Sequence, residues 1–213
     1  MERDITDIVP KKSKLRVVTD QGDILVADLM IVGKGVTPNK GIVKNTGIRT
    51  DKGILVNGRM QTNIPNVFAA GDVAQATNLL SDKNEVFANW PSACIEGKIA
   101  GLNMAGKKTE IPGEINYNIL PVFDQIAAFA EKREADHPEI EVLKYVNKKK
   151  GIYRKILVKR NRIVGAVSLG EYRDAGIFIN LIKKRVDISR VKQSLTRNAL
   201  VWGKVLNFSN RSF

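Results

Sequence analysis

Alternation of apolar and polar positions near the start of the chain predicts strands with one buried face. Residues 14–18 (KLRVV) alternate, the turn-forming residues 20–23 follow, and residues 24–27 (ILVA) are strand-like. This order predicts two paired strands joined by a turn. Residues 29–32 (LMIV) are instead a continuous apolar run, bounded by Gly33 and Gly35. Such a run predicts a strand buried on both faces, as in a parallel sheet.

The middle of the chain combines two further short strands with a helix. Residues 54–56 predict a strand closed by a tight Asn-Gly turn, and residues 67–70 (VFAA) predict a buried strand that ends abruptly at Gly71. A helix is expected over residues 91–104, because a proline suits its first turn. Small residues recur along one of its faces, which allows a close approach to a neighbouring element.

The pattern changes after residue 106, where a Pro-Gly pair at 112–113 is interpreted as a linker. Three strand-like runs follow and predict an antiparallel meander, with turns at residues 147–151 and 160–161. The runs cover residues 141–146, 152–159 and 162–169. A helix is expected over residues 173–184, with shorter helical pieces in the tail. The order predicts an α/β unit followed by a small α+β unit.

Composition excludes several classes of chemistry. Hydrophobic residues make up 43% of the 213 residues, and no apolar run reaches the length of a membrane span. The first four residues do not resemble a secretory signal, so a cytoplasmic protein is expected. Cys94 and His137 are the only residues of their kinds. A disulfide within the chain, a CxxC pair, a zinc cluster and a histidine-based triad are therefore not expected. Cys94 is interpreted as a packing residue and His137 as solvated surface.

The positive charge is concentrated in the last third of the chain. Residues 1–141 hold 17 Lys/Arg and 19 Asp/Glu, whereas residues 142–213 hold 18 Lys/Arg and 3 Asp/Glu. Such a break indicates two units with different surfaces. Three interpretations stay open: a solvated basic face, a docking surface for an acidic electron carrier, or nucleic-acid binding. The docking surface would be formed by Lys148, Lys149, Lys150, Arg154 and Lys155. The chain holds no recognised nucleic-acid motif, which disfavours the third.

A candidate ligand site lies where the strand at 67–70 would end. A carboxylate there, Asp72, would stand at the edge where open α/β sheets bind ligands, and Gly71 before it permits a close backbone approach. The helix beginning near Pro91 would point its positive dipole end at an electron-rich atom. A bare Gly-Asp pair is more often a simple turn, so the surrounding pattern has to decide.

That pattern resembles the FAD-dependent pyridine nucleotide–disulfide oxidoreductases. Residues 62–72 (TNIPNVFAAGD) are similar to the family's second flavin-binding motif. Residues 28–39 (DLMIVGKGVTPN) resemble the strand that leaves its nicotinamide domain, and residues 90–106 (WPSACIEGKIAGLNMAG) resemble the helix that follows the motif. The nearest group is that of NADH oxidases, rubredoxin reductases and nitrite-reductase flavin subunits. No GxGxxG fingerprint is present, so the chain is similar to the C-terminal half of such an enzyme.

The resemblance implies roles for seven residues. Asp72 would bind a ribityl hydroxyl of FAD, and Gly71 would lie against the phosphate–ribityl portion. The helix start at Pro91, Ser92 and Ala93 would face the pyrimidine edge of the flavin. Gly35 would lie near the nicotinamide cofactor, NAD(P)H, and Phe123 would approach the flavin ring. Trp90 is interpreted either as a shield for the flavin or as a packing residue.

The resemblance also implies an architecture and an activity. Residues 1–30 would end the nicotinamide-binding domain, residues 31–111 would form the C-terminal part of a three-layer α/β FAD-binding domain, and residues 112–213 would form an α+β domain with an antiparallel sheet. The enzyme would pass electrons from NAD(P)H through FAD to an acceptor such as rubredoxin, with the present chain inactive alone. A homodimer through the C-terminal domain is a further expectation. The alternative is a non-catalytic basic module that docks an acidic protein or nucleic acid.

Overall fold

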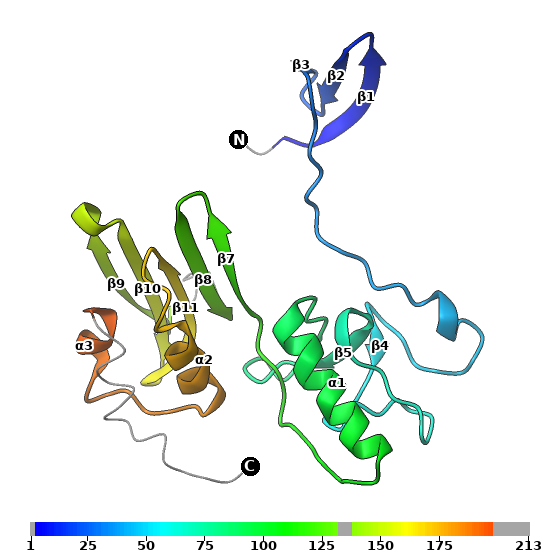
Figure 1. Cartoon of the computed structure of the whole chain (residues 1–213), viewed down its shortest axis with the longest axis vertical. Coiled ribbons are helices and arrows are strands. Elements are labelled where there is room, and N and C mark those ends of the chain that lie inside the picture. Colours follow the sequence, from blue (N-terminus) through cyan, green and yellow to red (C-terminus); the bar gives the residue numbers. More distant parts are fainter. Residues whose placement is uncertain (1–2, 132–137, 198–213) are drawn as a thin grey trace. The chain divides into compact units, whose positions relative to one another are not determined.

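A computed structural model describes residues 3–131 and 138–197 of the chain (Figure 1). The chain divides into two compact units, Met1–Thr37 and Pro38–Phe213. The first unit is a three-stranded antiparallel sheet. It consists of β1 (Ile5–Lys11), β2 (Lys14–Thr19) and β3 (Ile24–Ala27), in the order β1-β2-β3. The predicted strand pair is therefore confirmed. The sequence analysis missed β1, all seven residues of which are exposed.

The apolar run at residues 29–32 is not a strand, so that prediction was wrong. Leu29, Ile31 and Val32 are 74%, 86% and 71% exposed. A strand that is buried on both faces needs hydrogen-bonded neighbours at its edges, and among the described residues none pairs with this run. The prediction of a buried strand at residues 67–70 was also wrong. Among the described residues this run makes one isolated bridge, from Phe68 to Gln61, and its side chains are half-buried.

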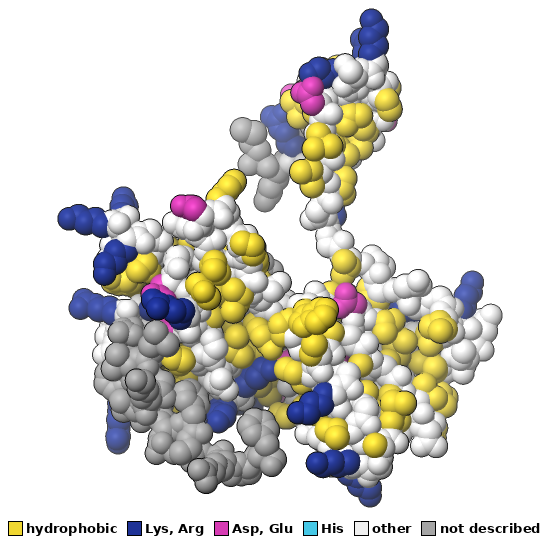
Figure 2. Space-filling model, viewed as in Figure 1, with side chains coloured by type: hydrophobic (Ala, Val, Ile, Leu, Met, Phe, Trp, Pro, Cys, Tyr) yellow, Lys and Arg dark blue, Asp and Glu magenta, His cyan; other side chains and the backbone are white. Residues whose placement is uncertain are grey.

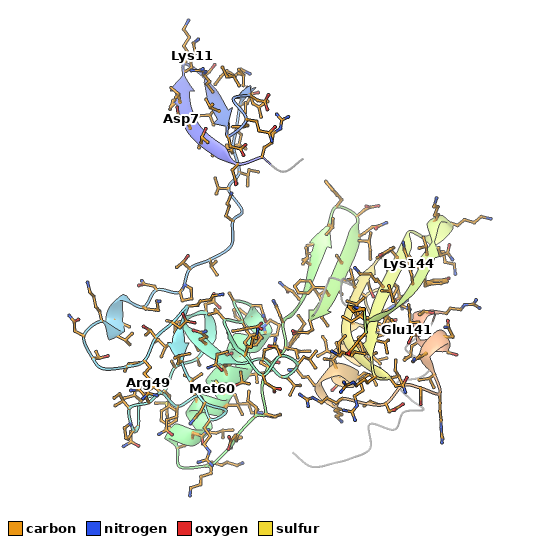
Figure 3. The ribbon with its side chains drawn as sticks, turned by 180° about the vertical axis from the view of Figure 1, so that it is seen from behind. Asp7, Lys11, Arg49, Met60, Glu141 and Lys144 are labelled. Atoms are coloured by element: carbon orange, nitrogen blue, oxygen red, sulfur yellow. The ribbon has the colours of Figure 1, made fainter. Side chains whose placement is uncertain are left out.

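The first part of the second unit holds a small mixed sheet and one long helix. The strands are β4 (Ile54–Leu55), β5 (Ala74–Thr77) and β6 (Asn84–Glu85), with β4 parallel and β6 antiparallel to β5. Helix α1 spans Trp90–Met104, as predicted, and two 3-10 turns, η1 (Gly41–Val43) and η2 (Gly71–Val73), complete this part. Its buried core joins the strands to α1; Figure 3 labels one member, Met60. The core residues are Ile54, Val56, Met60, Ala74, Ala76, Phe87, Ile99 and Ala100.

The C-terminal part is a five-stranded antiparallel sheet covered on one face by helices. The strand order is β7-β8-β11-β10-β9. The elements are β7 (Tyr117–Val122), β8 (Gln125–Glu131), β9 (Glu141–Asn147), η3 (Lys148–Lys150), β10 (Ile152–Lys159), β11 (Arg162–Leu169), α2 (Ala175–Lys183) and α3 (Lys192–Arg197). Helix α2 packs on β8 and β11, and α3 packs on β9 and β10. The predicted meander and helix are confirmed, whereas β7 and β8 were missed.

A buried ion pair lies in the core of this C-terminal part. The Arg154 guanidinium contacts the Asp174 carboxylate, both side chains are 2% exposed, and Arg154 Nη1 also donates to the Thr196 carbonyl at 2.8 Å. Burial raises the pKa of Asp174, and the nearby positive charge of Arg154 opposes that rise. The surrounding apolar core is large. It includes Leu79, Ile115, Leu143, Ile156, Val158, Ile163, Phe178, Leu181, Ile182, Ile188 and Leu195.

The predicted linker at residues 112–113 is held against its neighbours by hydrogen bonds. The Glu114 amide donates to the Thr77 carbonyl at 2.9 Å, and the Leu79 amide donates to the Glu114 carbonyl at 2.8 Å. A Cβ added at Gly113 would stand 2.9 Å from backbone atoms of Thr77 and Leu79. Lys183 of α2 lies 2.5 Å from the buried Glu114 carboxylate. These contacts join the α1 part to the C-terminal sheet.

Candidate functional site

The turn at Gly71–Asp72 packs against the first turns of α1. Ala70 is extended, and Gly71 takes a φ of +77°, which favours glycine over any residue with a side chain. A Cβ at Gly71 would stand 3.5 Å from Cβ of Ala93. The Gly71 amide donates to Glu96 Oε2 at 2.8 Å, while Asp72 is exposed. The backbone is therefore held from the helix side, and the Asp72 carboxylate stays accessible to a ligand.

The start of α1 is capped by the chain itself. Asn89 Oδ1 accepts the Ser92 amide at 3.0 Å, and the Asn89 carbonyl accepts the Ala93 amide at 3.1 Å. Pro91 has no N–H to offer. The amides that follow Pro91 are thus already bonded, so the positive end of the helix dipole remains as the contribution of this turn to an electron-rich ligand.

Buried polar atoms without a partner gather at the same helix start. In the described part of the chain they are Asn89 Nδ2, Ser92 Oγ, Glu96 Oε1, Arg154 Nε and Asp174 Oδ1. The first three come from residues 89–96, and Ser92 and Glu96 are 0% and 1% exposed. Buried polar atoms are normally hydrogen-bonded, so these three are an unsatisfied part of the packing at the start of α1, and a ligand does not reach them in this structure.

Glu96 is the titratable group of this site. Burial, together with the negative charges of Glu114 and Asp72, raises the pKa of its carboxyl group to about 7. The hydrogen bond from the Gly71 amide acts in the opposite direction, because it favours the ionised form. The carboxyl group therefore changes its protonation state near neutral pH.

The predicted site residues fall into two groups. Gly71, Asp72 and the helix start at residues 91–93 lie together, as described above. Gly35 belongs to the first unit, where it is exposed with a φ of +82°. Phe123 stands at the β7–β8 turn, 101% exposed and with a φ of +55°. The ligand roles of all seven residues stay predictions.

Sequence reasoning missed two residues of the site, Asn89 and Glu96. Asn89 precedes Trp90-Pro91, which is an N-cap signature that could have identified it. Glu96 follows Ser92 at helical i, i+4 spacing on the buried face, where a carboxylate is rare unless it has a partner. The interpretation of Cys94 as a packing residue was wrong, because it is exposed, and Trp90 is 82% exposed rather than packed. His137 lies outside the described residues.

A second feature is the basic turn between β9 and β10. Its three lysines, Lys148–Lys150, are exposed (Figure 2), and Asn147 Oδ1 accepts the Lys150 amide at 3.2 Å. On the adjacent sheet face the Lys144 ammonium lies 5.4 Å from the centre of the Tyr153 ring; Lys144 is labelled in Figure 3. Arg154 does not belong to this surface, although the sequence suggested it, because it is buried with Asp174.

Neither a metal site nor a membrane-spanning helix is found in the part of the chain that the structure describes. No group of three or more His, Cys, Asp or Glu side chains there is placed to hold a metal ion. None of the described helices combines the length and the apolar character that crossing a membrane requires.

Comparisons with protein families identify two matching segments. A model described as pyridine nucleotide-disulphide oxidoreductase matches residues 1–97, and one described as rubredoxin NAD+ reductase C-terminal domain matches residues 130–186. The first segment contains the three-stranded sheet of the first unit and the Gly71 turn, and the second contains β9, β10, β11 and α2.

Individual relatives cover most of this chain. It is 29% identical to the NADH-dependent phenylglyoxylate dehydrogenase subunit epsilon of Aromatoleum evansii, over 94% of the chain and 48% of the relative. It is 30% identical to the NADH-rubredoxin oxidoreductase of Clostridium acetobutylicum, over 80% and 42%. A solved structure of the covalent putidaredoxin reductase–putidaredoxin complex matches with a TM-score of 0.79 at 18% identity, over 96% of this chain and 48% of the solved one, and shows the fold alone. The chain thus spans about half the length of these proteins or less.

Proposed function

Because the chain belongs to the pyridine nucleotide–disulphide oxidoreductase superfamily, an enzyme family whose members use FAD and NAD(P)H, we propose that it is the C-terminal portion of such an oxidoreductase. The whole enzyme would pass electrons from NAD(P)H through FAD to an acceptor. Residues 31–111 would complete a three-layer FAD-binding domain whose Rossmann half is not in this chain. Residues 1–30 would end the nicotinamide domain, and residues 112–213 would form the C-terminal domain. The comparisons do not favour the alternative of a non-catalytic module.

The residues at the Gly71 turn fit the ribityl and flavin-edge portion of FAD. Asp72 is exposed and can accept hydrogen bonds from sugar-type hydroxyl groups, and Gly71 leaves room for a ligand atom close to the backbone. FAD, when bound, supplies the redox chemistry, whereas these residues bind and orient it.

One observation carries the proposal: Asp72 is an exposed carboxylate that directly follows a positive-φ glycine packed against the first turn of α1. A ligand with sugar-type hydroxyl groups can reach this carboxylate and donate hydrogen bonds to it. Phe123 and Gly35 are proposed to approach the flavin ring and the nicotinamide when the whole enzyme is assembled.

The first test uses the present chain. It holds no glycine-rich phosphate loop, which normally supplies the pyrophosphate site, so we expect it to purify with little flavin and without NAD(P)H oxidase activity. Absorbance spectroscopy measures this directly. A stoichiometric flavin band near about 450 nm would show that the chain binds the cofactor without a second dinucleotide-binding half.

The second test uses the native enzyme. Asp72→Ala should weaken FAD retention while it changes the Michaelis constant for NAD(P)H little, because it removes a charge-assisted hydrogen bond worth about 1.5–3 kcal/mol, or about tenfold to a hundredfold in affinity. Glu110→Ala is the matched control, since Glu110 is also an exposed carboxylate, and its side chain pairs with Arg59. If both variants keep FAD equally well through dialysis, Asp72 is not a ribityl ligand.

The basic turn at Lys148–Lys150 is proposed as the docking surface for an acidic electron-carrier protein such as rubredoxin. No acidic residue lies between Val142 and Gly170, so the positive field of this turn is not offset locally in the sequence. Charge complementarity raises the association rate, and salt weakens it. Reversing the three lysines to Glu should therefore slow electron transfer to the protein acceptor and remove most of its salt dependence. Turnover with a small neutral dye should not change, and equal losses with both acceptors would refute the docking role.

A further inference from the structure

Glu96 occupies an unusual place for a carboxylic acid. Its side chain is 1% exposed and projects from the second turn of α1 toward the η2 turn. One oxygen, Oε2, accepts the Gly71 amide at 2.8 Å, and the other, Oε1, has no partner. Among the described residues, the hydrogen bond that the Glu96 side chain makes is therefore to the glycine that precedes Asp72.

The charges facing Glu96 come from two further elements. Asp72 of η2 and Glu114 of the segment that follows α1 both repel an ionised Glu96. Glu114 is itself paired with Lys183, at 2.5 Å, whereas Asp72 is exposed. Together with burial, these charges raise the pKa of Glu96 to about 7. Glutamine at this position would make the same contact to Gly71 without any charge.

We infer that Glu96 is a positioning residue that holds the Gly71–Asp72 turn through the Gly71 amide, and that gain or loss of one proton at Glu96 Oε1 changes how firmly the turn is held. The inference rests on the proposed function for its meaning to FAD, because the turn carries the proposed ribityl ligand, Asp72. The coupling between Glu96 and Gly71 is a property of this chain alone.

The two protonation states differ at defined atoms. When Glu96 is protonated, its carboxyl group is neutral, and the repulsion from Asp72 and Glu114 is absent. When Glu96 is ionised, its hydrogen bond to the Gly71 amide becomes charge-assisted and stronger, while repulsion from Asp72 and Glu114 increases. Near neutral pH the protonated and the ionised forms of Glu96 are therefore both populated.

The test follows the Gly71 amide by NMR in the ¹⁵N-labelled chain from pH 5 to pH 9. We expect its chemical shift to titrate with a midpoint near 7, and we expect Glu96→Gln to abolish that titration while the amide stays hydrogen-bonded. Asp82→Asn is the matched control, because Asp82 is an exposed carboxylate of the same unit. This variant should leave the titration of the Gly71 amide unchanged. A Gly71 amide that does not titrate in the wild type, or that titrates equally in Glu96→Gln, overturns the inference.

A second measurement addresses the cofactor in the native enzyme. Glu96→Ala removes the acceptor for the Gly71 amide and should release FAD faster, whereas Glu96→Gln should retain FAD as the wild type does and lose any dependence of retention on pH between 6 and 8. Equal FAD release by the alanine and glutamine variants would contradict a positioning role through Gly71. A native protein that binds no FAD would refute the proposed function and leave the NMR result to decide the inference.

Discussion

The C-terminal sheet and the segment at residues 29–36 both contain apolar runs, but the runs of the sheet are buried and that of the segment is exposed. Ile156, Leu157 and Val158 of β10 are 0%, 0% and 1% exposed, between hydrogen-bonded neighbours on both sides. Ile31 and Val32 are 86% and 71% exposed and have no strand beside them in the described part of the chain. Apolar character alone therefore does not bury a strand. Neighbouring strands must be within reach.

The difference lies in how far along the chain the partners are. Strand β11 pairs with β10 through the two-residue turn Arg160–Asn161, whose φ values of +49° and +59° match the twist of an antiparallel hairpin. A parallel strand cannot be paired through a tight turn, because its neighbour has to return from the opposite end of the sheet. The C-terminal part of the chain thus contains its own partners, whereas residues 29–36 do not find theirs among the described residues.

The strongest way to break the well-packed region is to remove half of its buried ion pair. Arg154→Met leaves the Asp174 carboxylate buried and unpaired, which should cost about 3–5 kcal/mol of unfolding free energy. Urea denaturation followed by circular dichroism measures the loss. The double variant Arg154→Met, Asp174→Leu should recover much of it, because no charge remains buried. A loss below about 1 kcal/mol for the single variant, the size typical of exposed ion pairs, would show that Asp174 finds another partner.

A second experiment compares the α1 region with the C-terminal sheet through its pH dependence. The pKa of Glu96 lies above that of an ordinary glutamate, so the folded chain binds this proton more tightly than the unfolded chain does. The stabilisation is complete below a pH of about 4.5 and is lost as the pH rises through about 7. We expect a difference on the order of 2–3 kcal/mol between these limits, which Glu96→Gln should remove.

Hydrogen exchange, measured amide by amide, locates this effect. The pH-dependent change in protection should fall on α1 and the η2 turn, and subtracting the Glu96→Gln data cancels the contributions of other carboxyl groups such as Asp174. If wild type and Glu96→Gln lose protection in parallel as the pH rises, Glu96 is not the titrating group.

The smallest effect is expected at the exposed apolar run. Ile31→Ser removes an apolar side chain that is already 86% exposed, so the unfolding free energy of the present chain should change by no more than about 0.5 kcal/mol. Ile156→Ala, at a fully buried position, is the matched comparison and should cost about 2–5 kcal/mol. Thermal unfolding of both variants tests the contrast. Similar losses would mean that residues 29–36 are packed in solution.

Local patterns predicted the parts of the fold that depend on local partners. The bounds of β10 and β11 follow from alternating runs between turn residues, and α1 follows from its proline and small-residue spacing. Strand β7 was missed because Pro121 and the polar Asn118 interrupt its pattern, and β8 because its alanines alternate only weakly in hydrophobicity.

The parts of the site that could be predicted were those where the residue type itself indicates the backbone conformation, as glycine and proline do. Gly71 was identified because glycine permits a close backbone approach before Asp72, and the Pro91 helix start because proline suits a first helical turn before a periodic run. Glu96 was not identified, because its importance comes from a contact across 25 residues to Gly71 and from a charge on Glu114 that the sequence does not place nearby. Three-dimensional proximity, rather than spacing along the chain, creates its chemistry.

The backbone pairing at Gly113 has a mechanical consequence. A Pro-Gly pair has the composition of a hinge, yet here the residue that follows it is bonded into a β-bridge between Asn78 and Glu114. Rotation about residues 112–113 would break the Glu114–Thr77 and Leu79–Glu114 hydrogen bonds and strip Lys183 from a buried carboxylate at the same time. A displacement of the C-terminal sheet is therefore transmitted directly to β5, which continues from the Gly71–Asp72 turn, rather than absorbed at the connection.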